Sequence, residues 1–139
     1  MAVSVRDIFT YLVTRLETDP TLSGWGIEAF SLAAPEDHPC PFILMERQSG
    51  THHYAMTGEA LQKQWIFLKA VTTGEDGGKL ARQIMDRVNV LLTGETPTIA
   101  SGYVARIEAT TDLEYVETDT GNVQFYHVGT VYQFFLGNN

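Results

Sequence analysis

The sequence predicts an α+β domain: a mainly antiparallel sheet of four to five strands with two amphipathic helices packed on one face. Two stretches repeat apolar residues every three or four positions, as one face of a helix requires. Other stretches alternate or concentrate apolar, aromatic and β-branched residues, which is typical of strands. The 139 residues suit a single domain, so we expect residues 1–139 to fold as one unit.

The two expected helices lie at the start and in the second half of the chain. The apolar stripe of the first consists of Val5, Ile8, Phe9, Leu12 and Leu16. Ser4 suits its N-cap, and Asp19-Pro20 should end it because the residue before a proline avoids helical angles. The second spans residues 79–92, with Asp76 at its start and Gly94 closing its end.

Five strands are expected, at residues 26–31, 42–47, 62–71, 103–115 and 124–135. Residues 49–60 are expected to form a long loop between the second and third strands, and residues 119–122 a turn between the last two. Residues 103–115 alternate almost strictly, so one side of that strand should be buried and the other wet. The shared parity of Glu108, Asp112 and Glu114 places all three on the same side.

Charge and hydropathy exclude two classes of partner. The net charge is −8, and the nine basic residues are scattered rather than clustered, which argues against tight binding to nucleic acid. No apolar run approaches the ~18 residues that a membrane span needs, and the first residues lack the pattern of a signal peptide.

The sequence carries no catalytic motif, neither Gly-x-Ser-x-Gly nor His-Glu-x-x-His nor a dinucleotide fingerprint. We therefore expect no enzyme activity and no cofactor. The late carboxylates leave an alternative, a small carboxylate-based enzyme or ligand-binding domain, since paired carboxylates can catalyse hydrolysis or bind Ca²⁺. A solvated sheet face is the simpler interpretation, because nothing in the sequence indicates a cleft or shifted pKa values.

The four histidines do not predict a metal site. His52 and His53 are neighbours, which point to opposite sides of an extended chain, and His38 and His127 lie on distant segments. Residues 52–56 allow two interpretations, an exposed polar tip or a partner-binding surface. The candidates for partner binding are His52, His53, Tyr54 and Met56.

The order of these elements resembles the tail-terminator (tail-completion) proteins of long-tailed, siphovirus-type bacteriophages. The resemblance rests on the N-terminal helix from Val5 to Leu16, the proline-led strand Pro41–Glu46 and the hairpin after it. It continues through the strand Trp65–Leu68, the helix Lys79–Leu92 and the closing pair of strands. The resemblance covers nearly the whole chain. It rests on the chain length, the order of the elements and their residue patterns rather than on a specific motif.

The resemblance implies a structural virion protein at the head-proximal end of the tail, assembled in the bacterial host cytoplasm. Its partners would be copies of itself in a ring, usually a hexamer, together with the tail tube protein and a head–tail connector protein. The ring would end tube growth and offer a surface for head joining, while DNA passes through without specific binding. Another head–tail connector or minor tail protein is the alternative. We expect Glu108, Asp112 and Glu114, or part of that set, to face the lumen, where negative charge repels DNA.

Overall fold

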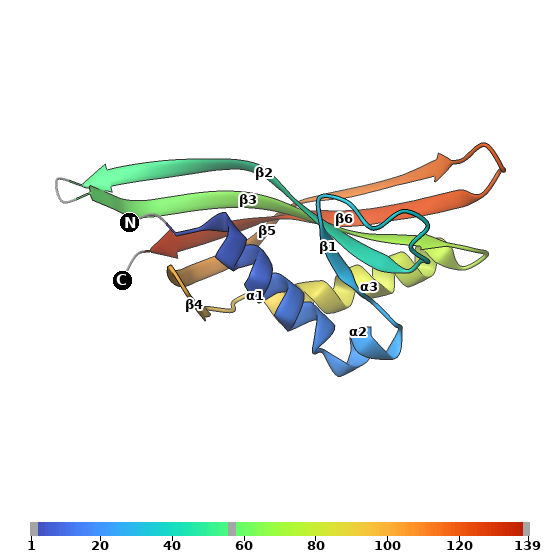
Figure 1. The fold of residues 1–139 in the computed structure, drawn as a ribbon, viewed down its shortest axis with the longest axis horizontal. Coiled ribbons are helices and arrows are strands. Elements are labelled where there is room, and N and C mark those ends of the chain that lie inside the picture. Colours follow the sequence, from blue (N-terminus) through green and yellow to red (C-terminus); the bar gives the residue numbers. More distant parts are fainter. Residues whose placement is uncertain (1–2, 56–57, 138–139) are drawn as a thin grey trace.

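The computed structural model describes residues 3–55 and 58–137, which form three helices and six strands (Figure 1). The helices are α1 (Val5–Glu17), α2 (Pro20–Gly24) and α3 (Gly77–Leu92). The strands are β1 (Ala29–Ser31), β2 (Phe42–Ala55), β3 (Gly58–Thr73), β4 (Thr98–Ile99), β5 (Gly102–Thr118) and β6 (Gln124–Gly137). In these ranges, no helix is long and apolar enough to cross a membrane.

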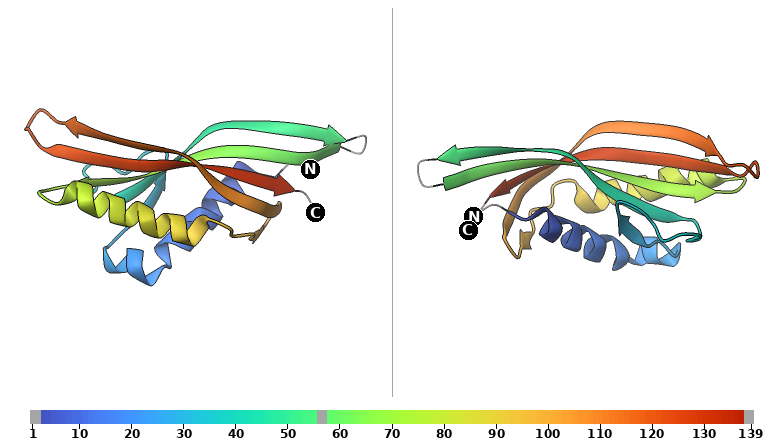
Figure 2. Two further views of the ribbon diagram at one scale, coloured as in Figure 1. Left: turned by 180° about the vertical axis from the view of Figure 1, so that it is seen from behind. Right: turned by 45° about the horizontal axis from the view of Figure 1, so that its top comes forward.

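All six strands belong to one sheet, in the order β1-β2-β3-β6-β5-β4. β1 runs parallel to β2, and the other neighbours are antiparallel. All three helices lie against the same side of the sheet, called here the helix-bearing face, and the other side is the open face (Figures 1 and 2). The predicted class is therefore right, but the sheet is larger and mixed, and α2 and β4 were too short to be predicted.

The core lies between the helices and the middle of the sheet. The apolar stripe of α1 is fully buried at Ile8, Leu12 and Leu16. The buried face of α3 includes Ile84 and Val88. From the sheet side, the core receives Ile66, Leu68, Tyr132 and Phe134, all with no exposed surface. Burying one such side chain contributes roughly 1.5–3 kcal/mol, so this layer provides most of the stability.

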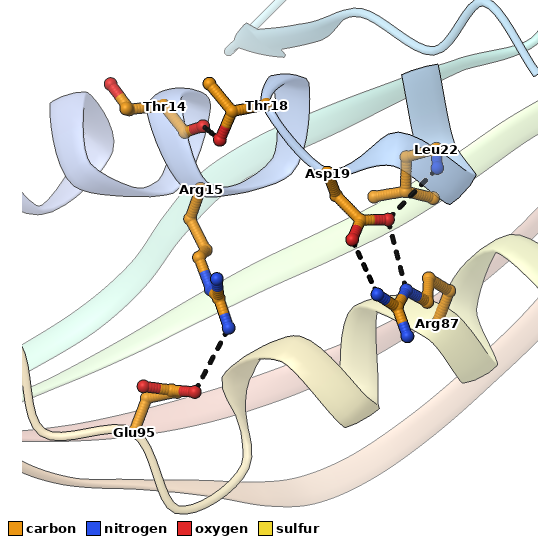
Figure 3. Close-up of polar contacts among 7 residues, drawn as sticks. All are labelled: Thr14, Arg15, Thr18, Asp19, Leu22, Arg87 and Glu95. Carbon is orange, nitrogen blue, oxygen red and sulfur yellow. Dashed lines mark hydrogen bonds and ion pairs between the residues drawn. The ribbon is translucent and has the colours of Figure 1, made fainter. Parts of the chain in front are cut away.

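A carboxylate that accepts three hydrogen bonds, from two residues, joins the helices to one another (Figure 3). Asp19 follows α1, and its Oδ2 accepts a hydrogen bond from the Leu22 backbone N–H at 3.1 Å, which caps α2. Arg87 of α3 donates from Nε to Oδ2 at 3.1 Å and from Nη2 to Oδ1 at 2.6 Å. The hydrogen bonds from Arg87 lower the pKa of Asp19, although burial opposes them. A second pair, Arg15 with Glu95 at 3.1 Å, links α1 to the segment after α3.

The expected loop at residues 49–60 is wrong for most of its length. β2 continues to Ala55 and β3 begins at Gly58, with Ser49 opposite Trp65 and Thr51 opposite Lys63. The hairpin was not predicted because its residues are mostly polar. A strand that projects from the core is held by backbone pairing and needs no alternation of apolar side chains.

Candidate interaction surfaces

Two hairpins project in opposite directions from the helix-covered centre (Figure 1). The β2–β3 arm comprises residues 46–55 and 58–64, and the β5–β6 arm comprises residues 111–131. Every side chain of residues 111–118 is exposed, including Leu113 and Val116 at 43% and 53%. The tip of this arm is a tight turn in which Asp119 Oδ1 accepts from the N–H groups of Gly121 and Val123.

The three late carboxylates do not share a side of β5, so that part of the prediction is wrong. Ala109 lies opposite Tyr132 and Thr111 opposite Val131, which leaves Thr110 as an extra residue in a β-bulge. Directly opposite residues of an antiparallel pair lie on the same face. Glu108, opposite Gln133, therefore lies on the open face. Asp112 and Glu114, opposite Thr130 and Val128, lie on the helix-bearing face.

A second bulge, between Val104 and Arg106, breaks the expected alternation again. Val104 and Ile107 are consequently both buried in the core, although their sequence separation is odd. Tyr103, Leu113 and Tyr115, expected on the buried side, are instead more than two-fifths exposed. At each of the two extra residues, the side chains that follow change to the opposite face of the sheet. A strict alternation along the sequence does not predict this change.

Each late carboxylate is bound to its own neighbour. Glu114 accepts from Arg82 Nε at 2.9 Å and Nη2 at 3.1 Å, and these hydrogen bonds lower its pKa. Asp112 Oδ1 accepts from the Thr130 hydroxyl at 2.9 Å. Glu108 lies 3.1 Å from Arg106. A carboxyl that acts as a general acid needs a raised pKa, so the environment of Glu114 is the reverse of what such a role requires.

A cluster that the sequence did not indicate lies on the open face, about midway along the β5–β6 arm. The rings of Tyr115 and His127 are stacked, with centroids 4.4 Å apart and planes 5° apart. Lys69 donates to the Tyr115 hydroxyl at 2.8 Å. His127 is buried, with Nε2 3.2 Å from Glu117 in a geometry that makes no hydrogen bond. Burial, and then the Lys69 charge, lowers the His127 pKa, although Glu117 opposes this.

The concave surfaces are shallow. One hollow of about 460 Å³ lies between the start of α3 and the β5–β6 arm, and its walls include the Arg82–Glu114 pair and His127. A groove of about 600 Å³ runs along α1 beside Phe9 and Val13. Neither brings together a set of groups suited to acid–base chemistry.

The histidines are dispersed. His52 is exposed on β2, while His38 makes edge-to-face contacts with Phe30 and Phe42, at centroid distances of 4.7 and 5.7 Å. The backbone of His53 and Tyr54 belongs to β2, and the expected contact residue Met56 lies outside the described residues. Over the described ranges, no three His, Cys, Asp or Glu side chains are grouped so as to hold a metal ion.

Comparisons with known proteins identify the fold. No protein-family model matches the sequence, and no curated protein matches it. Among solved structures, the chain is similar to a chain of the structure described as "Virion of native gene transfer agent (GTA) particle". The two superpose with a TM-score of 0.76 and 12% sequence identity, over 91% of this chain and 92% of the other. The similarity spans nearly both chains from end to end, and at this identity it establishes a common fold.

Proposed function

We propose that this protein is a structural component of a phage-type virion that forms a ring, a hexamer by the resemblance, on the end of the tail tube. The ring ends tube growth and provides the surface to which the head joins. The observation that carries the proposal is the fold shared with a chain of a gene transfer agent virion over almost the full length of both chains.

The form of the molecule supports an assembly role over the alternative, a carboxylate-based enzyme. The two arms extend paired backbone and exposed side chains away from the core, and such surfaces suit contacts with other subunits. The late carboxylates, in contrast, are each bound to a neighbouring Arg or Thr. The residues His52, His53, Tyr54 and Met56 of the β2–β3 arm are our candidates for partner binding.

The bulge in β5 restricts which of the acidic residues can face the proposed lumen. Glu108 and the pair Asp112 and Glu114 project from opposite faces, so the two sets cannot both line the DNA passage. Separate charge reversals, Glu108→Lys in one variant and Asp112→Lys with Glu114→Lys in another, test this. DNA delivery per assembled particle should fall in the variant whose set faces the lumen, and Glu108→Lys should leave particle assembly intact. Normal delivery by both variants would refute an acidic lumen.

Loss of the protein provides the test of the proposed function itself. Particles produced without it should carry tails of uncontrolled length that do not join heads, as measured by electron microscopy. The purified chain should cap preformed tail tubes as rings and block further addition of tube protein. Tails of normal length that lack heads would instead favour the alternative, another head–tail joining protein. Normal particles, with a chain that stays monomeric beside tail tubes, would refute a structural role.

A further inference from the structure

Both outer edges of the sheet include long stretches without a neighbouring strand. β1 pairs only with residues 43–45 of β2, and β4 pairs only with residues 102–103 of β5. Within the described residues, β2 from residue 46 and β5 from residue 104 therefore have a strand on one side only. Such an edge presents backbone N–H and C=O groups that can pair with a strand of another chain.

The regular parts of the two edges are long enough to pair. β-Bulges interrupt β2 near residue 48 and β5 near residues 105 and 110, and the register of β2 with β3 shifts again between His53 and Tyr54. Between or beyond these bulges, residues 49–53 and 111–118 keep an unbroken register with their inner partners. The side chains of residues 111–118 are exposed throughout, so no other part of the described chain covers this edge.

The charges of the two edges are complementary. Residues 111–118 contain Asp112, Glu114 and Glu117 and no Lys or Arg. Residues 47–53 contain Arg47 and no Asp or Glu, and with His52 and His53 neutral they carry a formal charge of about +1, against about −3 for residues 111–118. Like charges opposite each other on paired strands destabilise the pair and opposite charges stabilise it. A β5 edge is therefore a poor partner for another β5 edge and a good partner for a β2 edge.

Strand direction and side-chain faces agree with this pairing. Three antiparallel steps separate β2 from β5, so the two strands run in opposite directions. A second copy placed beside the first in the same orientation would thus bring its β2 antiparallel to β5. The side chain of Arg47, opposite Ile66, lies on the helix-bearing face with Asp112 and Glu114. The helices of both copies would then lie on the same side of a continuous sheet.

We infer that the β5 edge at residues 111–118 of one copy pairs with the β2 edge at residues 47–53 of the next. This names the partner of the arms as a second copy of the chain, and it rests on the proposed ring. Such a contact is head-to-tail, and repeated head-to-tail contacts give a ring when the rotation between neighbouring copies closes, as the proposed ring requires. Closure would leave neither edge unpaired, which is how an assembly removes the aggregation hazard of open edges.

Cysteine cross-linking tests the geometry of the contact. The single cysteine is first removed by Cys40→Ser. Leu113→Cys is then mixed with Thr51→Cys or Ser49→Cys, positions that all lie on the open face. Mixed oxidation should give disulfide-linked dimers for at least one pairing, because paired strands bring Cβ atoms to about 4.5–5.5 Å. Val90→Cys, at 66% exposure on α3, is the control and should stay uncoupled to Thr51→Cys.

Charge exchange tests the electrostatic selection. Arg47→Glu or Glu114→Lys should each weaken self-association by about tenfold per contact, since cross-strand pairs contribute on the order of 1 kcal/mol and reversal makes them repulsive. The double variant should recover much of the loss. Asp86→Lys, an exposed reversal on α3, is the matched control and should leave association unchanged.

The outcomes separate this inference from the proposed function. Cross-links at residues 113 and 49 or 51, with charge rescue, support the edge contact. Rings that form without cross-links in any pairing, and that tolerate both reversals, would overturn the inference while leaving the ring in place. A chain that stays monomeric at all concentrations, even with tail tubes, would overturn both.

Discussion

The helix-covered centre and the β5–β6 arm are built from the same two strands and are held by different forces. In the centre, Tyr132 and Phe134 of β6 have no exposed surface and pack under α1 and α3. In the arm, Leu113, Tyr115 and Val116 of β5 are 41–53% exposed, and continuous register with β6 is the main constraint. The centre gains stability from side-chain burial. The β5 strand of the arm, held by backbone pairing, keeps its side chains available for other subunits.

Truncating one leucine in each region should give the largest contrast. Leu12→Ala, in the buried stripe of α1, should destabilise the protein by about 2–5 kcal/mol because it leaves a cavity. Leu113→Ala, the same change at a 43% exposed position in the arm, should cost no more than about 0.5 kcal/mol. Urea unfolding followed by circular dichroism measures both. Comparable losses would show that the arm contributes to the core, contrary to the comparison.

The two arginine–carboxylate pairs of α3 offer a smaller contrast. Asp19 has a 3% exposed side chain and caps α2, whereas Glu114 in the arm is 49% exposed. Asp19→Ala should cost about 1–2 kcal/mol, near the upper part of the range for a lost N-cap. Glu114→Ala should cause no measurable loss, since exposed pairs contribute little. A larger effect of Glu114→Ala would mean that the arm depends on its salt bridge to Arg82.

The Asp19 contribution should also depend on pH in a defined direction. The folded-state pKa lies below the ordinary value of 3.8, mainly through the hydrogen bonds from Arg87. The stabilisation is therefore complete above about pH 3.8 and is lost as the pH falls through the folded pKa. The stability difference between the natural protein and Asp19→Asn, measured by unfolding from pH 6 to pH 2, should shrink only below pH 3.8. A difference that is already lost at pH 5 would contradict this cause.

The centre and the β5–β6 hairpin were predictable from sequence and the β2–β3 arm was not, for a physical reason. The stripe from Val5 to Leu16 and the face of α3 follow the helical period because one side of each helix must be buried. The hairpin after Arg47 has no such requirement, so its polar residues resemble a loop. Gly94 follows the end of α3 with a positive φ of 81°, as expected. This feature was predictable because glycine adopts positive φ readily and often follows a helix end.

The candidate surfaces depend on features that span strands. The bulge at Thr110 separates Glu108 from Asp112, and it exists only in the register between β5 and β6. The partnership of Arg82 with Glu114 likewise requires α3 to lie beside the arm. Neither has a signature in local spacing. The accumulation of acidic residues in 108–119 was visible in the sequence, and most of these residues lie on the β5–β6 arm.

The smallest expected effect is the pH dependence of stability that His127 causes. It tests whether the arm buries a titratable side chain. The folded-state pKa of His127 lies below 6.5, mainly because of burial and then because of Lys69, while Glu117 raises it. The unfolded chain therefore takes up the proton first, so stability is intact above about pH 6.5 and declines as the pH falls through 6.5 toward the folded pKa.

Glu117→Gln should enlarge this decline, because it removes the interaction that favours the protonated ring. His127→Gln should remove the decline, because it leaves no titrating group between Tyr115 and Lys69 in this range. Melting temperatures at pH 7.5 and pH 5.5 should thus fall most for Glu117→Gln, less for the natural protein and least for His127→Gln. The same decline in all three proteins would contradict this explanation. It would mean that the His127 ring is solvated and that burial in the arm does not lower its pKa.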